Sequence, residues 1–186
     1  MAFPLKITLV AALLLLTACR SDPIKFHTLV PTQPGNPSKS AVADIQIEAI
    51  SVPPQVDRPQ IVIRQGNSGL AILETEWWAA SLVDELSSAL QDQLVNGNSQ
   101  RKMSVRLDVQ RFDSIPGQYG LIDVKWRLRK LGEGDNALVT CRSTLQTPSG
   151  PSIDDLVAAQ QNNVKRLAAL ITQAANGTQR GCPPVQ

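Results

Sequence analysis

Residue types that commonly carry out chemistry are scarce in this chain of 186 residues, which contains one histidine and three cysteines. The histidine, His27, lies near the N-terminus, so we expect neither a histidine-based catalytic triad nor a multi-histidine metal site. We expect its side chain to lie at the surface. Glu74 and Glu76 are spaced like a pair of catalytic acids, but acids in the first turn of a helix explain them better.

Serine-based hydrolysis also lacks support, because the G-x-S-x-G motif is absent. The sequence therefore predicts no catalytic residue, no metal ligand and no cofactor. We expect a protein that is not an enzyme.

Composition favours one folded domain. Hydrophobic residues make up 42% of the chain, which is enough to form a core, and charged residues make up 18%. The formal net charge of +2 is too small for a nucleic-acid footprint, and aromatic residues, at 4%, are too few to provide stacking platforms. We therefore expect no binding to nucleic acid.

The N-terminal residues resemble a bacterial lipoprotein signal. Lys6 precedes an apolar run of about ten residues, whereas a membrane-spanning helix needs about 20. The run ends in Leu-Thr-Ala-Cys at 16–19, which resembles a lipobox. We predict a signal peptide over 1–18 and acylation of Cys19 (palmitate included), the alternative being an ordinary signal peptide followed by a cysteine. Lipoproteins kept in the inner membrane typically carry Asp where this chain has Arg20, so the resemblance implies the periplasmic face of the outer membrane.

Two cysteines, Cys141 and Cys182, remain for the oxidising periplasm. A disulfide between them would close a loop of roughly 40 residues and contribute roughly 4 kcal/mol in the chain-entropy model. The alternative is two independent thiols, one buried and one in a frayed tail. We favour the disulfide because an exposed thiol is a liability in that compartment.

The mature chain divides into three parts. Residues 19–43 contain four prolines and predict a tether that reaches at most ~80 Å when extended. Within it, residues 26–29 form an apolar island that could dock as an edge strand. Residues 44–177 form the folded domain, and 178–186 form a C-terminal tail.

Strands are predicted from alternation of apolar and polar residues and from short apolar runs. The predicted strands are 45–49, 61–63, 70–73, 103–110, 122–129 and 137–145. Short turns containing glycine join the last three, which indicates an antiparallel meander with one solvated face. Basic residues gather on that face, which could meet phosphates or an acidic partner but is most simply explained as solvated: Lys125, Arg127, Arg129, Lys130 and Arg142.

Two amphipathic helices complete the predicted fold. The first begins at Trp78, which is in phase with its leucine stripe, and ends before 96–98. The second is capped by Ser152, with Asp155 as the box partner, and ends near residue 176. Both helices need an apolar surface, so the predicted class is α+β: an antiparallel β-sheet with two amphipathic helices packed on one face.

Several stretches resemble the ABC-type transport auxiliary lipoproteins, the PqiC-like group. The resemblance rests on Ile-Ser-Val-Pro at 50–53, Val-Asp-Arg-Pro-Gln-Ile-Val at 56–62 and Trp-Ala-Ala-Ser-Leu at 78–82, together with the island at 26–29. The family usually has an aromatic residue at the position of His27 and a proline at that of Ser81. The resemblance extends from the lipobox to about residue 176.

This resemblance implies a non-enzymatic outer-membrane lipoprotein in an MCE-type, ABC-driven system that moves lipids between membranes. The protein would act as a docking or anchoring partner of a periplasmic MCE-type protein that works with inner-membrane transporter components. Whether the protein forms a homo-oligomer stays open.

Three residues are candidates for binding that partner. Asp57 and Arg58 form a charged pair beside Pro59 in a loop stiffened by prolines, although a turn that merely starts the next strand explains them equally well. Trp77, next to the in-phase Trp78, could be an exposed interface anchor or could pack partly against the preceding strand.

Two other functional classes stay open. A lipoprotein plug or assembly factor of an outer-membrane barrel would share the anchor and the fold, and co-purification with a barrel would favour it. A periplasmic hydrolase would draw on the serines, aspartates and lysines of the chain, and an esterase or peptidase screen would detect it.

Overall fold

The computed structural model describes residues 22–32, 43–94, 101–132, 139–177 and 181–184. The elements in chain order are β1 (Lys25–His27), β2 (Ala43–Ser51), β3 (Gln60–Gln65), β4 (Gly69–Trp78), α2 (Leu82–Leu94), β5 (Arg101–Ile115), β6 (Tyr119–Lys130), β7 (Val139–Pro148) and α3 (Ile153–Asn176). The predicted α+β class is confirmed. The lipobox, Cys19 and most of the C-terminal tail lie outside the described residues.

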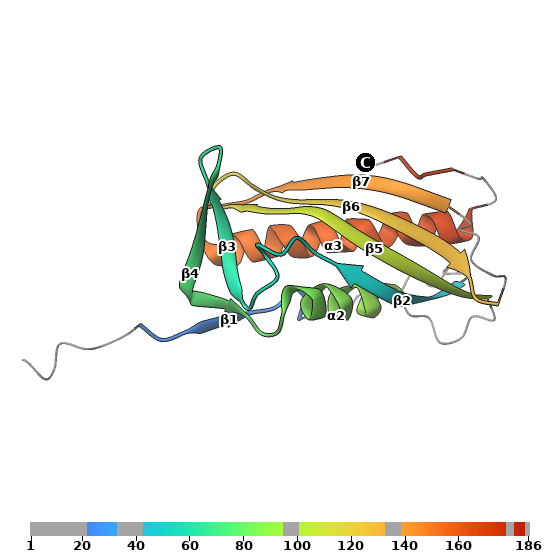
Figure 1. Ribbon diagram of the computed structural model, residues 1–186, viewed down its shortest axis with the longest axis horizontal. Coiled ribbons are helices and arrows are strands. Elements are labelled where there is room, and N and C mark those ends of the chain that lie inside the picture. Colours follow the sequence, from blue (N-terminus) through green and yellow to red (C-terminus); the bar gives the residue numbers. More distant parts are fainter. Residues whose placement is uncertain (1–21, 33–42, 95–100, 133–138, 178–180, 185–186) are drawn as a thin grey trace, which may run out of the picture.

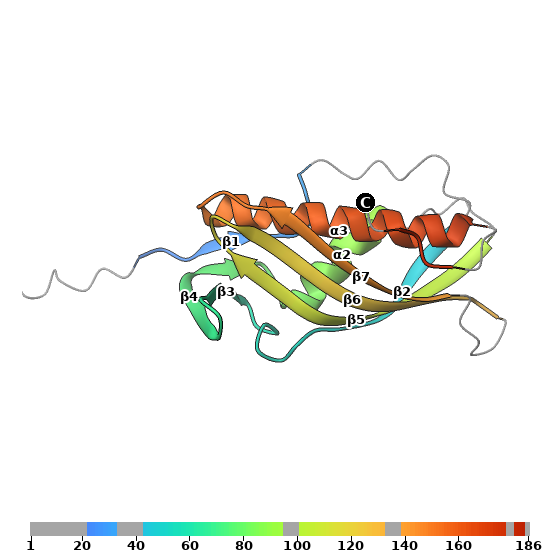
Figure 2. The same ribbon diagram turned by 90° about the horizontal axis from the view of Figure 1, so that it is seen from above.

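The large sheet has four strands in the order β2-β5-β6-β7. Strands β5, β6 and β7 form the predicted antiparallel meander, and β2 joins β5 in parallel. Helix α3 runs along one face of this sheet with α2 beside it, and the other face is left to solvent (Figures 1 and 2).

A small sheet of three strands, in the order β1-β4-β3, lies at one end of the elongated molecule (Figure 1). Its β3–β4 hairpin is antiparallel, whereas β1 pairs with β4 in parallel. The sequence predicts one antiparallel sheet, and the structure instead divides the strands into two sheets with one parallel pair in each. Parallel neighbours need a long crossover connection, and here the small-sheet hairpin and α2 are the crossover between β2 and β5.

The core lies between the large sheet and the two helices. Alternate residues of β5 and β6 point inward and are fully buried, among them Val105, Ile122 and Leu128 at 0% exposure. Leu86 and Leu90 of α2 and Ile171 of α3 close the other side. The period of two in the strands and of 3.6 in the helices is therefore sufficient to place most of the core.

A buried polar seam fixes the first half of α3 on the sheet. Gln160 and Asn163 are both 0% exposed, and Asn163 Nδ2 donates to the carbonyl of Gly120 at 2.9 Å. Gln160 Nε2 donates to the carbonyl of Asp113 at 2.9 Å. A Cβ at Gly120 would lie 2.9 Å from Gln160 Cδ, so any other residue there would displace the Gln160 amide from its place in the seam.

The ends of the helices follow their caps. Ser152 and Asp155 form the predicted capping box at the start of α3. Helix α2 begins at Leu82 rather than at Trp78, because Ser81 Oγ accepts the N–H of Asp84 at 3.2 Å. Trp78 is buried as predicted, but it ends β4.

Residues that the sequence assigns to the tether are part of the fold. β1 is the edge strand that the apolar island 26–29 suggested, and Leu29 just after it is 0% exposed. Glu85 of α2, buried at 5% exposure, accepts the Leu29 N–H and the Thr28 hydroxyl at 2.7 Å each. Only the residues before β1 are therefore left to link Cys19 to the fold.

Candidate functional site

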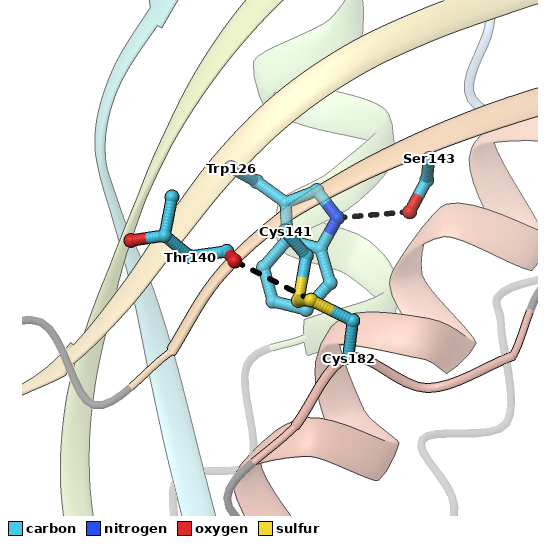
Figure 3. Close-up of a disulfide and its surroundings, with 5 residues drawn as sticks. All are labelled: Trp126, Thr140, Cys141, Ser143 and Cys182. Carbon is cyan, nitrogen blue, oxygen red and sulfur yellow. Dashed lines mark hydrogen bonds between the residues drawn. A yellow bond between two sulfur atoms is a disulfide. The ribbon is translucent and has the colours of Figure 1, made fainter.

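Cys141 and Cys182 form a disulfide at the end of the molecule away from the small sheet. Cys141 of β7 and Cys182 lie with their Cα atoms 5.5 Å apart, within the usual range for a bridge. Cys141 pairs in register with Trp126 of β6, whose Nε1 donates to Ser143 Oγ at 3.0 Å (Figure 3). Cys182 Sγ lies 3.3 Å from the Thr140 carbonyl oxygen. The predicted bridge thus fastens the C-terminal segment to the buried side of the large sheet.

The loop between β2 and β3 carries the candidate pair Asp57 and Arg58, and short backbone bonds hold it. The N–H of Val56 donates to the Pro53 carbonyl at 3.0 Å, and that of Arg58 donates to the Val56 carbonyl at 2.9 Å. Val56 is buried at 7% exposure, so the loop is pinned from inside. At the other end of the loop, the Pro59 carbonyl accepts a backbone hydrogen bond from the small sheet.

A backbone hydrogen bond joins the loop to the small sheet, because the Trp78 N–H donates to the Pro59 carbonyl at 2.6 Å. Asp57 is exposed, and neither Asp57 nor Arg58 forms an ion pair within the described residues. The Arg58 Nε is buried without a hydrogen-bond partner in the same part of the chain. The loop therefore presents an acidic and a basic side chain on a fixed backbone at the junction of the two sheets, and neither has an ion-pair partner within the described residues.

A second charged group lies beside this loop. Asp113 of β5, whose side chain is 6% exposed, accepts from Arg64 of β3 at 3.1 Å and also pairs with Arg111. A cavity of about 30 Å³ between Val56, Arg64 and Phe112 has room for water and is far below the ~300 Å³ of a typical ligand pocket. These contacts tie the small sheet to the end of β5.

Trp77, the third candidate, lies at the end of β4 and not at a helix start. Its ring packs edge-on against Phe26 of β1, with centroids 6.3 Å apart, and its Nε1 donates to the Glu74 carbonyl at 2.9 Å. Its side chain is therefore half-buried against β1, and Glu74 and Glu76 lie in the same strand instead of a helical first turn. The exposed aromatic of this pair is Phe26.

His27 is largely buried, with 9% of its side chain exposed, which corrects the surface position expected for it. Its Nε2 lies 2.6 Å from Glu76 and its Nδ1 lies 3.4 Å from Asp154 at the start of α3. The His27 hydrogen bond, with help from Lys25, holds the pKa of Glu76 below its ordinary value although partial burial acts in the other direction. These bonds join the N-terminal strand to both β4 and α3.

The solvent face of the large sheet carries ion pairs. Glu48 of β2 accepts from Arg106 at 2.7 Å and from Arg129 at 2.9 Å. Asp123 is 3% exposed and is held by the guanidinium of Arg142, which keeps the pKa of Asp123 below its ordinary value. Two of the five basic residues that the sequence places on this face, Arg129 and Arg142, are therefore paired with acids.

Lys125 and Arg127 are the exceptions on that face. Both are exposed and lie in register between β5 and β7, and neither has an ion-pair partner in the part of the chain that the structure describes.

Chemistry-bearing residues are not brought together. Within the described ranges, no group of three histidine, cysteine or acidic side chains is placed to hold a metal ion. Ser99 and Lys102 have the S-x-x-K spacing, but Ser99 lies outside the described residues and Lys102 donates to Asp44. A hollow of about 140 Å³ between β7 and α3 is lined by Leu145, Arg166 and Leu170 and is also small for a ligand pocket. Neither described helix has the length and hydrophobicity to cross a bilayer.

Sequence reasoning missed three residues that hold α2 and α3 to other parts of the fold. Glu85, Gln160 and Asn163 are polar and buried, and each holds a segment distant in sequence. The only available signal was their place among the apolar positions of α2 and α3, where a polar residue needs a buried partner.

Comparisons with known proteins agree with this architecture. A crystal structure of a Xanthomonas campestris protein of the DUF330 family superposes with a TM-score of 0.63 at 18% identity, covering 81% of this chain and 95% of that one. A crystal structure of an uncharacterized protein gives a TM-score of 0.61 at 16% identity, covering 82% and 98%. At these identities the likeness shows the fold alone, and no curated protein matches.

The family is defined more directly by sequence. The model of the ABC-type transport auxiliary lipoprotein component matches residues 27–172, from β1 to the last turns of α3. The family is a transport family and is not known as an enzyme family. Because this match covers most of the sequence, the chain belongs to the ABC-type transport auxiliary lipoproteins.

Proposed function

We propose that the protein is an outer-membrane lipoprotein that faces the periplasm and anchors a periplasmic MCE-type partner of an ABC-driven lipid transport system. The observation that carries the docking role is the loop with Asp57 and Arg58. Its backbone is fixed at both ends by hydrogen bonds, and its two charges have no ion-pair partner within the described residues. A preformed charged loop binds a partner without the entropic cost of ordering.

The anchor sets where such a dock would stand. Acylation of Cys19 leaves only residues 20–24 before β1, and these span at most about 20 Å. The long reach expected for a tether up to residue 43 is not available to the first strand, because β1 and Leu29 are packed into the fold. A partner that crosses the periplasm must therefore come close to the outer membrane to meet the loop.

The anchor is tested by replacing the acylated residue. Cys19→Ser should abolish palmitate labelling and release the protein from membranes or leave its signal uncleaved, whereas Ser21→Ala should change neither property. Arg20→Asp should move the labelled protein toward the inner-membrane fraction on a density gradient. Labelling that persists in Cys19→Ser would refute the anchor.

The dock is tested by a matched pair of double variants. Asp57→Ala with Arg58→Ala should abolish pull-down of the MCE-type partner, while Lys125→Ala with Arg127→Ala, which also removes two exposed charges, should retain it. Both variants should unfold within about 1–2 kcal/mol of wild type.

Two results would change the assignment. Loss of folding together with binding would make the loop residues structural, and retained binding would move the interface to Trp77 or to the basic residues of the large sheet. Co-purification with an outer-membrane barrel in place of the MCE-type partner would favour the plug or assembly-factor alternative.

A further inference from the structure

Exposed apolar side chains gather at the small-sheet end of the molecule. Among the described residues, the large hydrophobic side chains that are exposed are Ile24 (44%), Phe26 (64%), Leu70 (46%), Ile72 (47%) and Leu131 (45%). All but Leu131 belong to β1, to the residue before it, or to β4, which are neighbours in the small sheet. Leu131 follows β6 at the opposite end of the large sheet (Figure 1).

The hairpin that carries Leu70 and Ile72 projects beyond the large sheet (Figures 1 and 2). It turns at Gly66, whose φ of 59° suits glycine, and its base is fixed because Ile61 and Val62 of β3 are buried. The hairpin is thus a firmly held element whose outer half exposes apolar side chains to solvent.

The N-terminal strand has the same character. Phe26 is the most exposed of these residues, although its ring contacts Trp77, and the adjacent Lys25 keeps 69% of its side chain exposed. Trp77 retains a hydrogen bond through its Nε1. Aromatic rings with satisfied polar atoms, next to a long cationic side chain, are typical of the zone between water and the acyl chains of a bilayer.

The position of the acylation site identifies the surface that would cover these residues. Phe26 is seven positions after Cys19, so a fully extended chain places it within about 25 Å of the anchored residue. β1 cannot swing away from the fold, because backbone pairing with β4 and the Glu85 bonds hold it. The end of the molecule nearest the bilayer is therefore the end that exposes apolar side chains.

We propose that this end is a membrane-contact surface, in which Ile24, Phe26, Leu70 and Ile72 enter the interfacial layer of the bilayer that holds the acyl chains of Cys19. The inference rests on the acylation proposed above. Acyl chains alone would leave the fold free to rotate about its short linker, whereas apolar contacts on two separate strands fix its orientation. The charged loop with Asp57 is then presented at a defined height above the membrane.

The test uses the acylated full-length mature protein in vesicles of phosphatidylethanolamine and phosphatidylglycerol, with part of the lipid brominated on its acyl chains. Bromine quenches tryptophan only at short range, and Trp77 is the half-buried tryptophan at this end, whereas Trp78 and Trp126 are buried at 3% and 1% exposure. Wild type should be quenched, and Trp77→Phe should lose most of that quenching.

Leu70→Ser with Ile72→Ser should lower the quenching of Trp77 at least twofold. Leu131→Ser is the matched control, because it removes an equally exposed leucine from the opposite end, and it should leave quenching at the wild-type level. Thermal melts of the soluble Cys19→Ser forms establish that all variants are folded.

The outcomes separate this inference from the proposed function. Mass spectrometry that finds no acyl chain on Cys19 removes both. An acylated wild type that is not quenched, or a Leu70→Ser, Ile72→Ser variant quenched as strongly as wild type, overturns the membrane contact alone. The contact is also overturned if this variant instead dissociates an oligomer in detergent, because the surface then lies between copies of the chain.

Discussion

The two sheets of this protein differ in the side chains that they expose to solvent. The large sheet covers its inner face with two helices, and its outer face neutralises most of its charges internally, as in the Asp123–Arg142 and Glu48–Arg106 pairs. The small sheet exposes Phe26, Leu70 and Ile72 to solvent. The large sheet therefore carries most of the buried core, and the small sheet with the adjoining charged loop carries the exposed surfaces for which we propose partners.

The strongest test of this difference between the sheets is to truncate one buried and one exposed apolar side chain of similar size. Leu128→Ala on the large sheet should cost about 2–5 kcal/mol of unfolding free energy, because Leu128 is 0% exposed and the substitution leaves a cavity. Ile72→Ala on the small sheet should change it by no more than about 0.5 kcal/mol in the non-acylated protein. Urea unfolding measures both, and equal costs would contradict the division.

The disulfide tests whether the far end of the large sheet depends on covalent support. Cys141→Ser and Cys182→Ser should each cost about 2–4 kcal/mol, since each opens the same loop. The double variant should lose no more than the worse single variant. Losses that add would mean that the two cysteines act independently.

A single substitution in α2 should weaken the attachment of β1 to the fold. Glu85→Ala leaves the buried Leu29 N–H without its acceptor and should cost about 1–3 kcal/mol, while Glu85→Gln keeps an acceptor oxygen and should cost less. Hydrogen exchange would show the loss at residues 25–29 before the meander exchanges. Uniform loss of protection throughout the fold would contradict a separately attached β1.

Acid should affect each sheet through one carboxylate. The pKa values of Asp123 and Glu76 are lowered by Arg142 and His27 respectively, so each ionised carboxylate stabilises the fold fully above the ordinary carboxylate range. That stabilisation is lost as the pH falls through the lowered folded-state pKa. Asp123→Asn and Glu76→Gln should each flatten the decline of melting temperature below about pH 4.5. A decline as steep as in wild type would show that the ion pair contributes nothing.

Much of the large sheet could be predicted from the sequence, because β5, β6 and β7 alternate over a large part of their length and are joined by short connections. Pairing between distant strands could not, since nothing in the pattern of β1 or β2 names β4 or β5 as its neighbour. Adjacent tryptophans before a leucine stripe indicate a longer helix, but the cap at Ser81 starts α2 after them. Residues 26–29 were recognisable as an apolar island, whereas Glu85, which accepts hydrogen bonds from Thr28 and Leu29, looks like an ordinary helix acid.

The site was predictable in a similarly uneven way. Asp57 and Arg58 could be placed in a stiff loop from the surrounding prolines, and the structure adds the lack of an ion-pair partner within the described residues. Leu70 and Ile72 lie in a short apolar run that predicts a strand, but such a run does not reveal that the hairpin projects beyond the large sheet (Figure 1).

β1 pairs in parallel with β4, and β2 pairs in parallel with β5. These two pairings also constrain the order of folding. β1 must wait for β4, which begins 44 positions after the start of β1 (69 − 25), and β2 must wait for β5, which begins 58 positions after the start of β2 (101 − 43). An exported chain emerges N-terminus first, so its first two strands stay unpaired until much of the domain has followed, whereas the β5–β7 meander is local and can form early. The segment next to the proposed lipid anchor is thus completed late, so it would stay accessible during the proposed export and acylation.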